Sequence, residues 1–188
     1  MAEDLRLKKL AKLISKKNKI LDLGCSAIPN IYLKNKEVIG VDLVDKELPK
    51  NYTDLKICNV LEMNKLFADN NIDGIVAGEI LEHVEDPIGF LRECYNTLGE
   101  NGLIVLSTPN PNSFIERLLT LNLSRNYFYT KDHIMLYPQR WLIRMMEIAG
   151  FKDVKLYSGG MIFPFFSLIP FPRPWCYQTI ATGIKKNK

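Results

Sequence analysis

Three residues that could carry acid–base or metal chemistry stand close together near the middle of the chain. Glu79, Glu82 and His83 fall within five positions, in the stretch 79-EILEHV-84, and they directly follow the apolar run 72-IDGIVA-77. If this stretch forms a helical turn, the three side chains share one face, because residues three and four apart are neighbours on a helix. The sequence therefore predicts a polar cluster at the end of a buried strand.

The only other histidine of the chain is His133, and together with the first cluster it supports three interpretations. Neutral His83 or His133 could be a catalytic general base, since the ordinary pKa of histidine is near neutrality. Glu79, Glu82, His83 and His133 also offer the oxygen and nitrogen ligands of a divalent metal such as magnesium or zinc. In the third interpretation Glu82 and His83 only organise the turn and His133 caps another one. The residues alone leave all three open.

Length and composition restrict the class of protein. A chain of 188 residues is long enough for one domain with a full core and too short for two ordinary ones. The hydrophobic fraction is 47%, the charged fraction is 24% and the net charge is only +4, so nothing requires a nucleic-acid partner. Basic residues cluster in 6–19, but leucines at helical spacing there predict a solvated amphipathic helix.

The cysteines and the apolar segments favour a cytoplasmic protein. The four cysteines show no CxxC spacing and no signal peptide precedes them, so a reduced protein without a disulfide or zinc framework is expected. The most apolar segment, 161-MIFPFFSLIPFPRPW-175, contains four prolines. It is too short and too interrupted for a transmembrane segment.

Short apolar runs alternate with helical patterns along the chain. Runs of this length suit strands that are buried on both faces of a parallel sheet. The clearest helix is 87–98, with Asp86 as its cap and Gly99 after its end, and 138–149 has the same pattern. This alternation predicts a doubly wound α/β sheet. The predicted strands are 19–23, 37–43, 54–58, 72–77 and 103–107.

The last part of the chain departs from this alternation. The strand-like runs 151–158 and 177–184 have no helical pattern between them, so they are expected to pair antiparallel. We therefore predict a single domain over 1–188. Its parts are an N-terminal helix in 1–18, an acceptor or lid insertion in 109–137 and a proline-rich flap in 159–176.

Two positions predict a nucleoside-binding site. Gly24 follows the first strand, where it allows a tight turn, and a helix is expected to begin at Pro29. Asp42 ends the second strand, twenty residues after Asp22, where its carboxylate can accept hydrogen bonds from the hydroxyls of a ribose. The expected ligand therefore lies above the carboxyl ends of these strands.

Five segments in this order resemble the class I S-adenosylmethionine-dependent methyltransferases. They are 20-ILDLGCS-26, 38-VIGVDL-43, 73-DGIVAGEILEHVEDP-87, 98-LGENGLIVLSTPNP-111 and 149-AGF-151. The resemblance covers about residues 19 to 158. It implies a Rossmann-like, mostly parallel seven-stranded sheet in the order 3-2-1-4-5-7-6, with an antiparallel C-terminal strand.

The same resemblance implies which residues bind S-adenosyl-L-methionine. The methionine part faces the first loop, the ribose binds Asp42, the adenine lies between residues of the third strand's end, and the sulfur lies at the end of the fourth strand. The residues that match are Asp22, Gly24, Cys25, Ser26, Asp42, Leu43, Asn59, Val60, Ala77, Gly78 and Glu79.

One departure from the family concerns the first loop. The family usually has GxGxG, whereas this chain has 24-GCSAI-28, with Ser26 and Ile28 at the second and third glycine positions. A positive φ at Ser26 would cost about 1–2 kcal/mol, so a loop of different path is expected. If Ser26 merely replaces glycine, Ser26→Gly should leave cofactor binding intact or improve it. This departure also motivates an alternative, a methyltransferase-fold protein that binds a ligand or partner without catalysis.

The ExxEH turn with a later histidine is similar to that of metal-dependent O-methyltransferases that act on catechol intermediates of ubiquinone synthesis or on the terminal ribose of small RNAs. This resemblance implies O-methylation of a small molecule with hydroxyl groups, such as a phenolic, quinone-precursor or sugar acceptor. The apolar segment 161–175 could cover an apolar or lipid-linked acceptor. A nicotinamide-dependent dehydrogenase is disfavoured because the first loop lacks GxGxxG.

Overall fold

The computed structural model describes residues 2–67, 71–113, 117, 133–163, 166–169 and 173–186. Within these residues the central sheet consists of β1 (Lys19–Leu23), β2 (Glu37–Asp42), β3 (Asp54–Ile57), β4 (Ile72–Gly78), β5 (Leu98–Pro109), β6 (Lys152–Ser158) and β9 (Gln178–Ile184). The strands lie in the order β3-β2-β1-β4-β5-β9-β6.

The sheet is parallel except for one strand. β1 pairs parallel with β2 and β4, β3 with β2, and β5 with β4. β9 is antiparallel to both of its neighbours, β5 and β6. The predicted doubly wound sheet with an antiparallel C-terminal strand is therefore confirmed, and so is the antiparallel pairing of the last two long runs.

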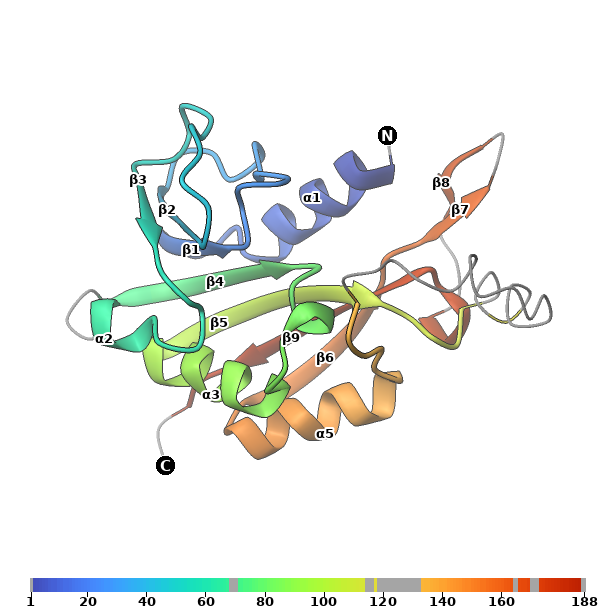
Figure 1. The fold of residues 1–188 in the computed structure, drawn as a ribbon. Helices are drawn as coiled ribbons and strands as arrows, with labels where there is room; N and C mark the ends of the chain where they lie inside the picture. Colours follow the sequence, from blue (N-terminus) through green and yellow to red (C-terminus); the bar gives the residue numbers. More distant parts are fainter. Residues whose placement is uncertain are drawn as a thin grey trace.

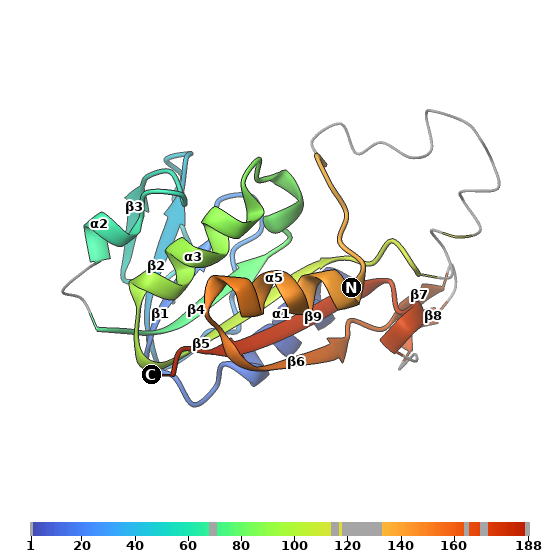
Figure 2. The same cartoon turned by 90° about the horizontal axis from the view of Figure 1, so that it is seen from below.

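Helices cover both faces of the sheet (Figure 1). α1 (Ala2–Leu13) lies on one face, where Leu10 and the following Ile14 join a buried cluster with Ile20 and Val76 of the sheet. α3 (Pro87–Thr97) and α5 (Gln139–Ala149) lie side by side on the opposite face, as Figure 2 shows from below. The short α2 (Asn64–Phe67) contributes the buried Phe67 to the core beneath α3.

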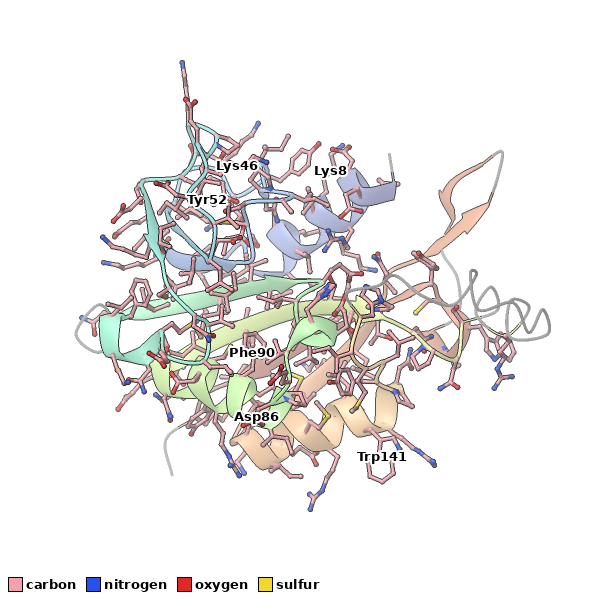
Figure 3. All side chains as sticks on the ribbon, viewed as in Figure 1. Lys8, Lys46, Tyr52, Asp86, Phe90 and Trp141 are labelled. Carbon is pink, nitrogen blue, oxygen red and sulfur yellow. The ribbon has the colours of Figure 1, made fainter. Side chains whose placement is uncertain are left out.

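The two predicted helices begin and end as their sequences indicate. Asp86 caps α3 by accepting a hydrogen bond from the amide of Gly89 across 2.8 Å, and Phe90 is fully buried. Gly150 ends α5 with a φ of 114°, a backbone conformation that suits glycine. Figure 3 shows Phe90 on the side of α3 nearer the sheet and Trp141 pointing away from α5.

The helix expected to start at Pro29 is absent, so this prediction was wrong. Residues 24–36 form turns and irregular backbone. α1 already covers this face of the sheet, and the polar groups of the loop find partners elsewhere. The amide of Asn30 donates to the hydroxyl of Tyr52 across 2.7 Å, and the side-chain amide of Asn51 donates to the carbonyl of Asn30 across 3.1 Å.

The predicted flap contains regular structure that the sequence did not indicate. β7 (Met161–Phe163) and β8 (Phe166–Ile169) pair antiparallel as a separate two-stranded sheet, followed by the short helix η3 (Arg173–Trp175). Most of the predicted insertion 109–137 lies outside the described residues. None of the described helices is both long and apolar enough to cross a membrane.

Candidate active site

A cavity of about 490 Å³ opens at the carboxyl ends of β1 and β4. From the predicted set it is lined by Gly24, Gly78, Glu79, His83 and His133. The structure thus brings together residues that the sequence placed in three separate segments. The cavity also has lining residues that were not predicted as site residues, and they come from α1, from the loop after β1 and from the region where β9 begins.

The loop after β1 needs its one glycine. Gly24 has a φ of 69°, and a Cβ atom added to it would lie 3.2 Å from the Cδ1 atom of Ile80. Ser26, in contrast, does not have a positive φ. Serine therefore occupies the second glycine position of the family without the backbone strain that a left-handed conformation would cause.

Asp42 accepts hydrogen bonds at both carboxylate oxygens. The amide of Ser26 donates to Oδ2 across 2.8 Å, and the amide of Val44 donates to Oδ1 across 3.0 Å. An ionised carboxylate has about four acceptor positions, so the predicted ribose hydroxyls can still bind. Leu43 lies beside it with 70% of its surface exposed. The amide of Cys58 donates to the Asp42 carbonyl across 2.9 Å, which brings the end of β3 alongside.

The remaining predicted cofactor residues differ in exposure. Asn59 is exposed and Val60 is half-buried after β3, whereas Ala77 is buried in β4. None of these, and neither Asp42 nor Leu43, is among the described lining of the cavity. The structure therefore separates the predicted residues into a group at the cavity and a group at the ends of β2 and β3.

Asp22 and Cys25 are buried beneath the first loop. The Asp22 carboxylate accepts hydrogen bonds from the Tyr52 hydroxyl and from the Asn30 amide, and burial raises its pKa to about 6. Burial likewise raises the pKa of the Cys25 thiol to about 12. A thiol with so high a pKa is not nucleophilic, so only the backbone of Cys25 is offered to a ligand.

Glu79 has a left-handed backbone conformation, and only one of its two carboxylate oxygens accepts a hydrogen bond among the described residues. Its φ is 55°, and its amide donates to the carbonyl of Ser107 across 3.0 Å. Its Oε2 atom accepts a hydrogen bond from the side chain of Gln178 across 2.9 Å. Its Oε1 atom is buried without a hydrogen-bond partner among the described residues. Burial raises the pKa of this carboxyl group, and the nearby Arg6 opposes that rise.

Glu82 is fully buried in the short helix η1 (Leu81–His83). Its Oε2 atom accepts a hydrogen bond from the hydroxyl of Thr108 across 3.1 Å, and its buried Oε1 atom has no partner among the described residues. Burial, and then the charge of Glu79, raise the pKa of Glu82 to about 8. Glu79 lies outside η1, and Glu82 is buried whereas His83 is exposed, so the predicted single helical turn was wrong.

The two histidines meet although fifty positions of chain separate them. The ring centroids of His83 and His133 lie 4.9 Å apart, with an interplanar angle of 72°. The carbonyl of Glu82 accepts a hydrogen bond from the amide of Ile134 across 2.8 Å, which fixes the second segment against η1. Glu82, His83 and His133 each offer one ligand atom within 4.8 Å of the others. Glu79 is not part of this closer cluster.

Arg6 of α1 is a site residue that the sequence analysis missed. It is 2% exposed, forms an ion pair with Glu3 and donates to the hydroxyl of Ser107 across 3.1 Å. Its charge lowers the pKa of both Glu79 and Glu82. The sequence did contain a signal for its burial. Arg6 stands four residues before Leu10 and eight before Ile14, so it lies on the apolar face of the helix.

Comparison with known proteins identifies the family. The model of a family described as a methyltransferase domain matches residues 2–156. The chain belongs to this family. The class predicted from the sequence, the class I S-adenosylmethionine-dependent methyltransferases, is therefore confirmed.

The methyltransferase family includes relatives of known name. The chain is 27% identical over 161 residues to a ubiquinone biosynthesis O-methyltransferase of Dinoroseobacter shibae, a match that covers 77% of this chain and 63% of the relative. It is also 27% identical over 143 residues to a probable S-adenosylmethionine-dependent methyltransferase of Mycobacterium tuberculosis, covering 73% of this chain and 50% of the relative. The chain thus spans about half to two thirds of the length of these relatives.

A solved methyltransferase structure supports the same fold. A possible histamine N-methyltransferase from Thermotoga maritima superposes with a TM-score of 0.77 at 18% identity, covering 97% of this chain and 89% of the other. At this identity the likeness concerns the fold alone.

Proposed function

We propose that this methyltransferase transfers the methyl group of S-adenosylmethionine to an oxygen atom of a small molecule that carries hydroxyl groups. The observation that carries the proposal is that His83 and His133, which line the cavity together with Gly24 and Gly78, converge with the buried Glu82. The name of the Dinoroseobacter relative, an O-methyltransferase, supports oxygen as the acceptor atom.

The chain's own residues would bind the cofactor at two groups of positions. Asp42 would accept hydrogen bonds from the ribose, and the exposed Leu43 would cover one side of the adenine. At the cavity the backbone of Gly24 and Gly78 leaves room for the methionine part, and the buried cation of Arg6 lines the same cavity. Arg6 would therefore face the methionine carboxylate.

Cofactor and acceptor supply most of the reactivity. S-adenosylmethionine supplies an electrophilic methyl group, whose bond to sulfur breaks as the bond to the acceptor oxygen forms. The protein must align the acceptor and remove the hydroxyl proton. His83 and His133 line the cavity, so either neutral imidazole could accept that proton at a ring nitrogen. Glu82 is buried, and its pKa of about 8 keeps most of it protonated at neutral pH, so it is less available as the base.

The residues present also fit a divalent metal. The buried Oε1 atom of Glu82 lacks a partner among the described residues, and a cation held with His83 and His133 would satisfy it. Glu82, His83 and His133 would hold the ion, with Glu79 beside them, and the mixed oxygen and nitrogen donors suit magnesium, manganese or zinc. A bound ion would lower the pKa of the acceptor hydroxyl. An acceptor with two adjacent hydroxyls, such as a catechol or a sugar diol, would use this arrangement best.

Calorimetry and a transfer assay test the proposal together. Titration with S-adenosylmethionine, S-adenosylhomocysteine and NAD should show binding of the first two alone. Transfer to catechols, monophenols and sugar diols is then measured as S-adenosylhomocysteine formed. A protein that binds NAD instead, or that binds S-adenosylmethionine but methylates none of these hydroxyl acceptors, contradicts the proposed function.

A chelator separates the two interpretations of the histidines. If the cluster holds a metal, excess chelator should abolish transfer and leave cofactor affinity nearly unchanged, and an added divalent ion should restore transfer. His83→Ala and His133→Ala should behave like the chelated protein, while the exposed neighbour Glu85→Ala serves as the control. Transfer that survives the chelator but not the histidine substitutions indicates general base catalysis instead.

A further inference from the structure

Ser26 makes a contact that the family's usual glycine cannot make. Its hydroxyl donates to the carbonyl of Val44 across 2.9 Å. Its amide donates to one oxygen of Asp42, and the amide of Val44 donates to the other. These three hydrogen bonds close a ring through Ser26, Asp42 and Val44, which we call the Ser26 clamp. The clamp joins the loop after β1 to the loop after β2.

Ser26 is the buried member of the clamp, and the surface around it is exposed. Ser26 is 4% exposed, whereas Leu43 and Val44 are 70% and 58% exposed. The hydrogen bond of its hydroxyl is therefore partly protected from water, while the side chains of Leu43 and Val44 are exposed. A hydrogen bond protected in this way holds its partners more firmly than one that water can replace.

The Ser26 clamp holds the first residues of the loop after β2. Residues 43–50 contain neither helix nor strand. The far end of this loop is fixed by Tyr52, whose hydroxyl donates to Asp22, and by Asn51, whose side chain donates to the carbonyls of Asn30 and Leu33. At the near end the corresponding bonds are those of the Ser26 clamp. The loop after β2 is thus attached to the loop after β1 at both of its ends.

The backbone at position 26 accepts serine as well as glycine, so the two residues differ here only in what the side chain contacts. Ser26 does not have a positive φ, so its position does not require the conformational freedom of glycine. Its side chain, and not its backbone, distinguishes this loop from the family pattern.

We propose that Ser26 is a positioning residue for the cofactor, because its hydroxyl fixes the loop that presents Asp42 and Leu43 to the nucleoside. The proposal rests on the proposed function, since it takes these two residues as the ribose and adenine contacts. Ser26 acts through them and does not itself need to touch the cofactor. The serine thus adds a side-chain hydrogen bond to a loop that lacks two of the family's glycines.

Two substitutions at one position test the clamp. Ser26→Ala and Ser26→Gly both remove the hydroxyl and both retain the amide that Asp42 binds. Each should weaken binding of S-adenosylmethionine and S-adenosylhomocysteine by about two- to tenfold, the range expected for one neutral hydrogen bond. The KM for the cofactor should rise while kcat stays nearly constant, because the histidine cluster lies elsewhere. Ser15→Ala, at an exposed serine, is the matched control.

Hydrogen exchange of backbone amides tests the clamp independently of the proposed function. In the free protein the Val44 amide should exchange faster in Ser26→Ala than in the native chain. If exchange and affinity are both unchanged, or if Ser26→Gly binds the cofactor as well as the native chain does, the clamp is overturned. If the native protein binds no S-adenosylmethionine, the proposed function fails and the cofactor role of Ser26 fails with it, whereas faster exchange would still establish the clamp as a loop contact.

Discussion

Arg6 donates a hydrogen bond to the hydroxyl of Ser107 across 3.1 Å, although the two residues lie 101 positions apart in the chain. Ser107 also accepts, through its carbonyl, the hydrogen bond from the amide of Glu79. The first helix, the fifth strand and the end of the fourth strand are therefore fastened together at one edge of the cavity. α1 is part of the candidate site and not merely a cover for the sheet.

Arg6→Ala should weaken S-adenosylmethionine binding by about tenfold or more. The substitution removes the buried cation expected to face the methionine carboxylate, and charge-assisted hydrogen bonds contribute about 1.5–3 kcal/mol. Lys12→Ala on the exposed side of the same helix is the control. Calorimetry provides the affinity, and a circular dichroism spectrum checks that the sheet is retained. Equal affinity in the two variants would contradict the role of Arg6.

Gly78→Ala should reproduce part of this loss without removing any charge. A Cβ atom at Gly78 would lie 2.7 Å from the Nη1 atom of Arg6, so the flexible end of the arginine must move. We expect a folded protein with reduced cofactor affinity, measured by calorimetry. In the double variant, Gly78→Ala should lower cofactor affinity less than it does in the native chain, because the arginine side chain that it displaces is already absent.

Asp42→Ala should weaken cofactor binding more than either substitution of Ser26. It removes the predicted ribose acceptor and also both amide contacts of the clamp. Two charge-assisted hydrogen bonds of about 1.5–3 kcal/mol each predict a loss of at least a hundredfold. Unchanged affinity in a titration with S-adenosylmethionine would place the ribose elsewhere.

Stability should depend on pH through Glu82 when no metal is added. Burial raises its pKa from the ordinary 4.5 to about 8, so between these values the folded state keeps a proton that the unfolded chain has released. The contribution of Glu82 to the free energy of unfolding is therefore fully present below pH 4.5 and is lost as the pH rises through 8. Within this range the free energy of unfolding falls by at most about 1.4 kcal/mol per pH unit. Melting temperatures between pH 6 and 8 should fall less for Glu82→Gln than for the native chain. Parallel curves for the two would show that Glu82 is already ionised.

The sequence predicted the sheet well because its signals are local. Apolar runs mark the buried strands, and Asp86 and Gly150 mark helix ends within a few residues of the helices themselves. The missed features depend on distant contacts. Arg6 becomes a site residue only because α1 packs beside Ser107, and the helix expected at Pro29 is absent because α1 already covers that face. The meeting of His83 and His133 was anticipated by one of the three interpretations of these residues, a shared metal site, and the family resemblance supported that interpretation.

The order of the strands has a consequence for how the site comes into being during synthesis. β9 is the last strand of the sheet in the chain, yet it lies between β5 and β6, and its Gln178 holds the side chain of Glu79. Arg6, which lines the same cavity, leaves the ribosome well before β9. A nascent chain can therefore fold the β1–β4 half around α1 early, but the cavity acquires its final wall only when β9 has inserted into a gap between strands made before it.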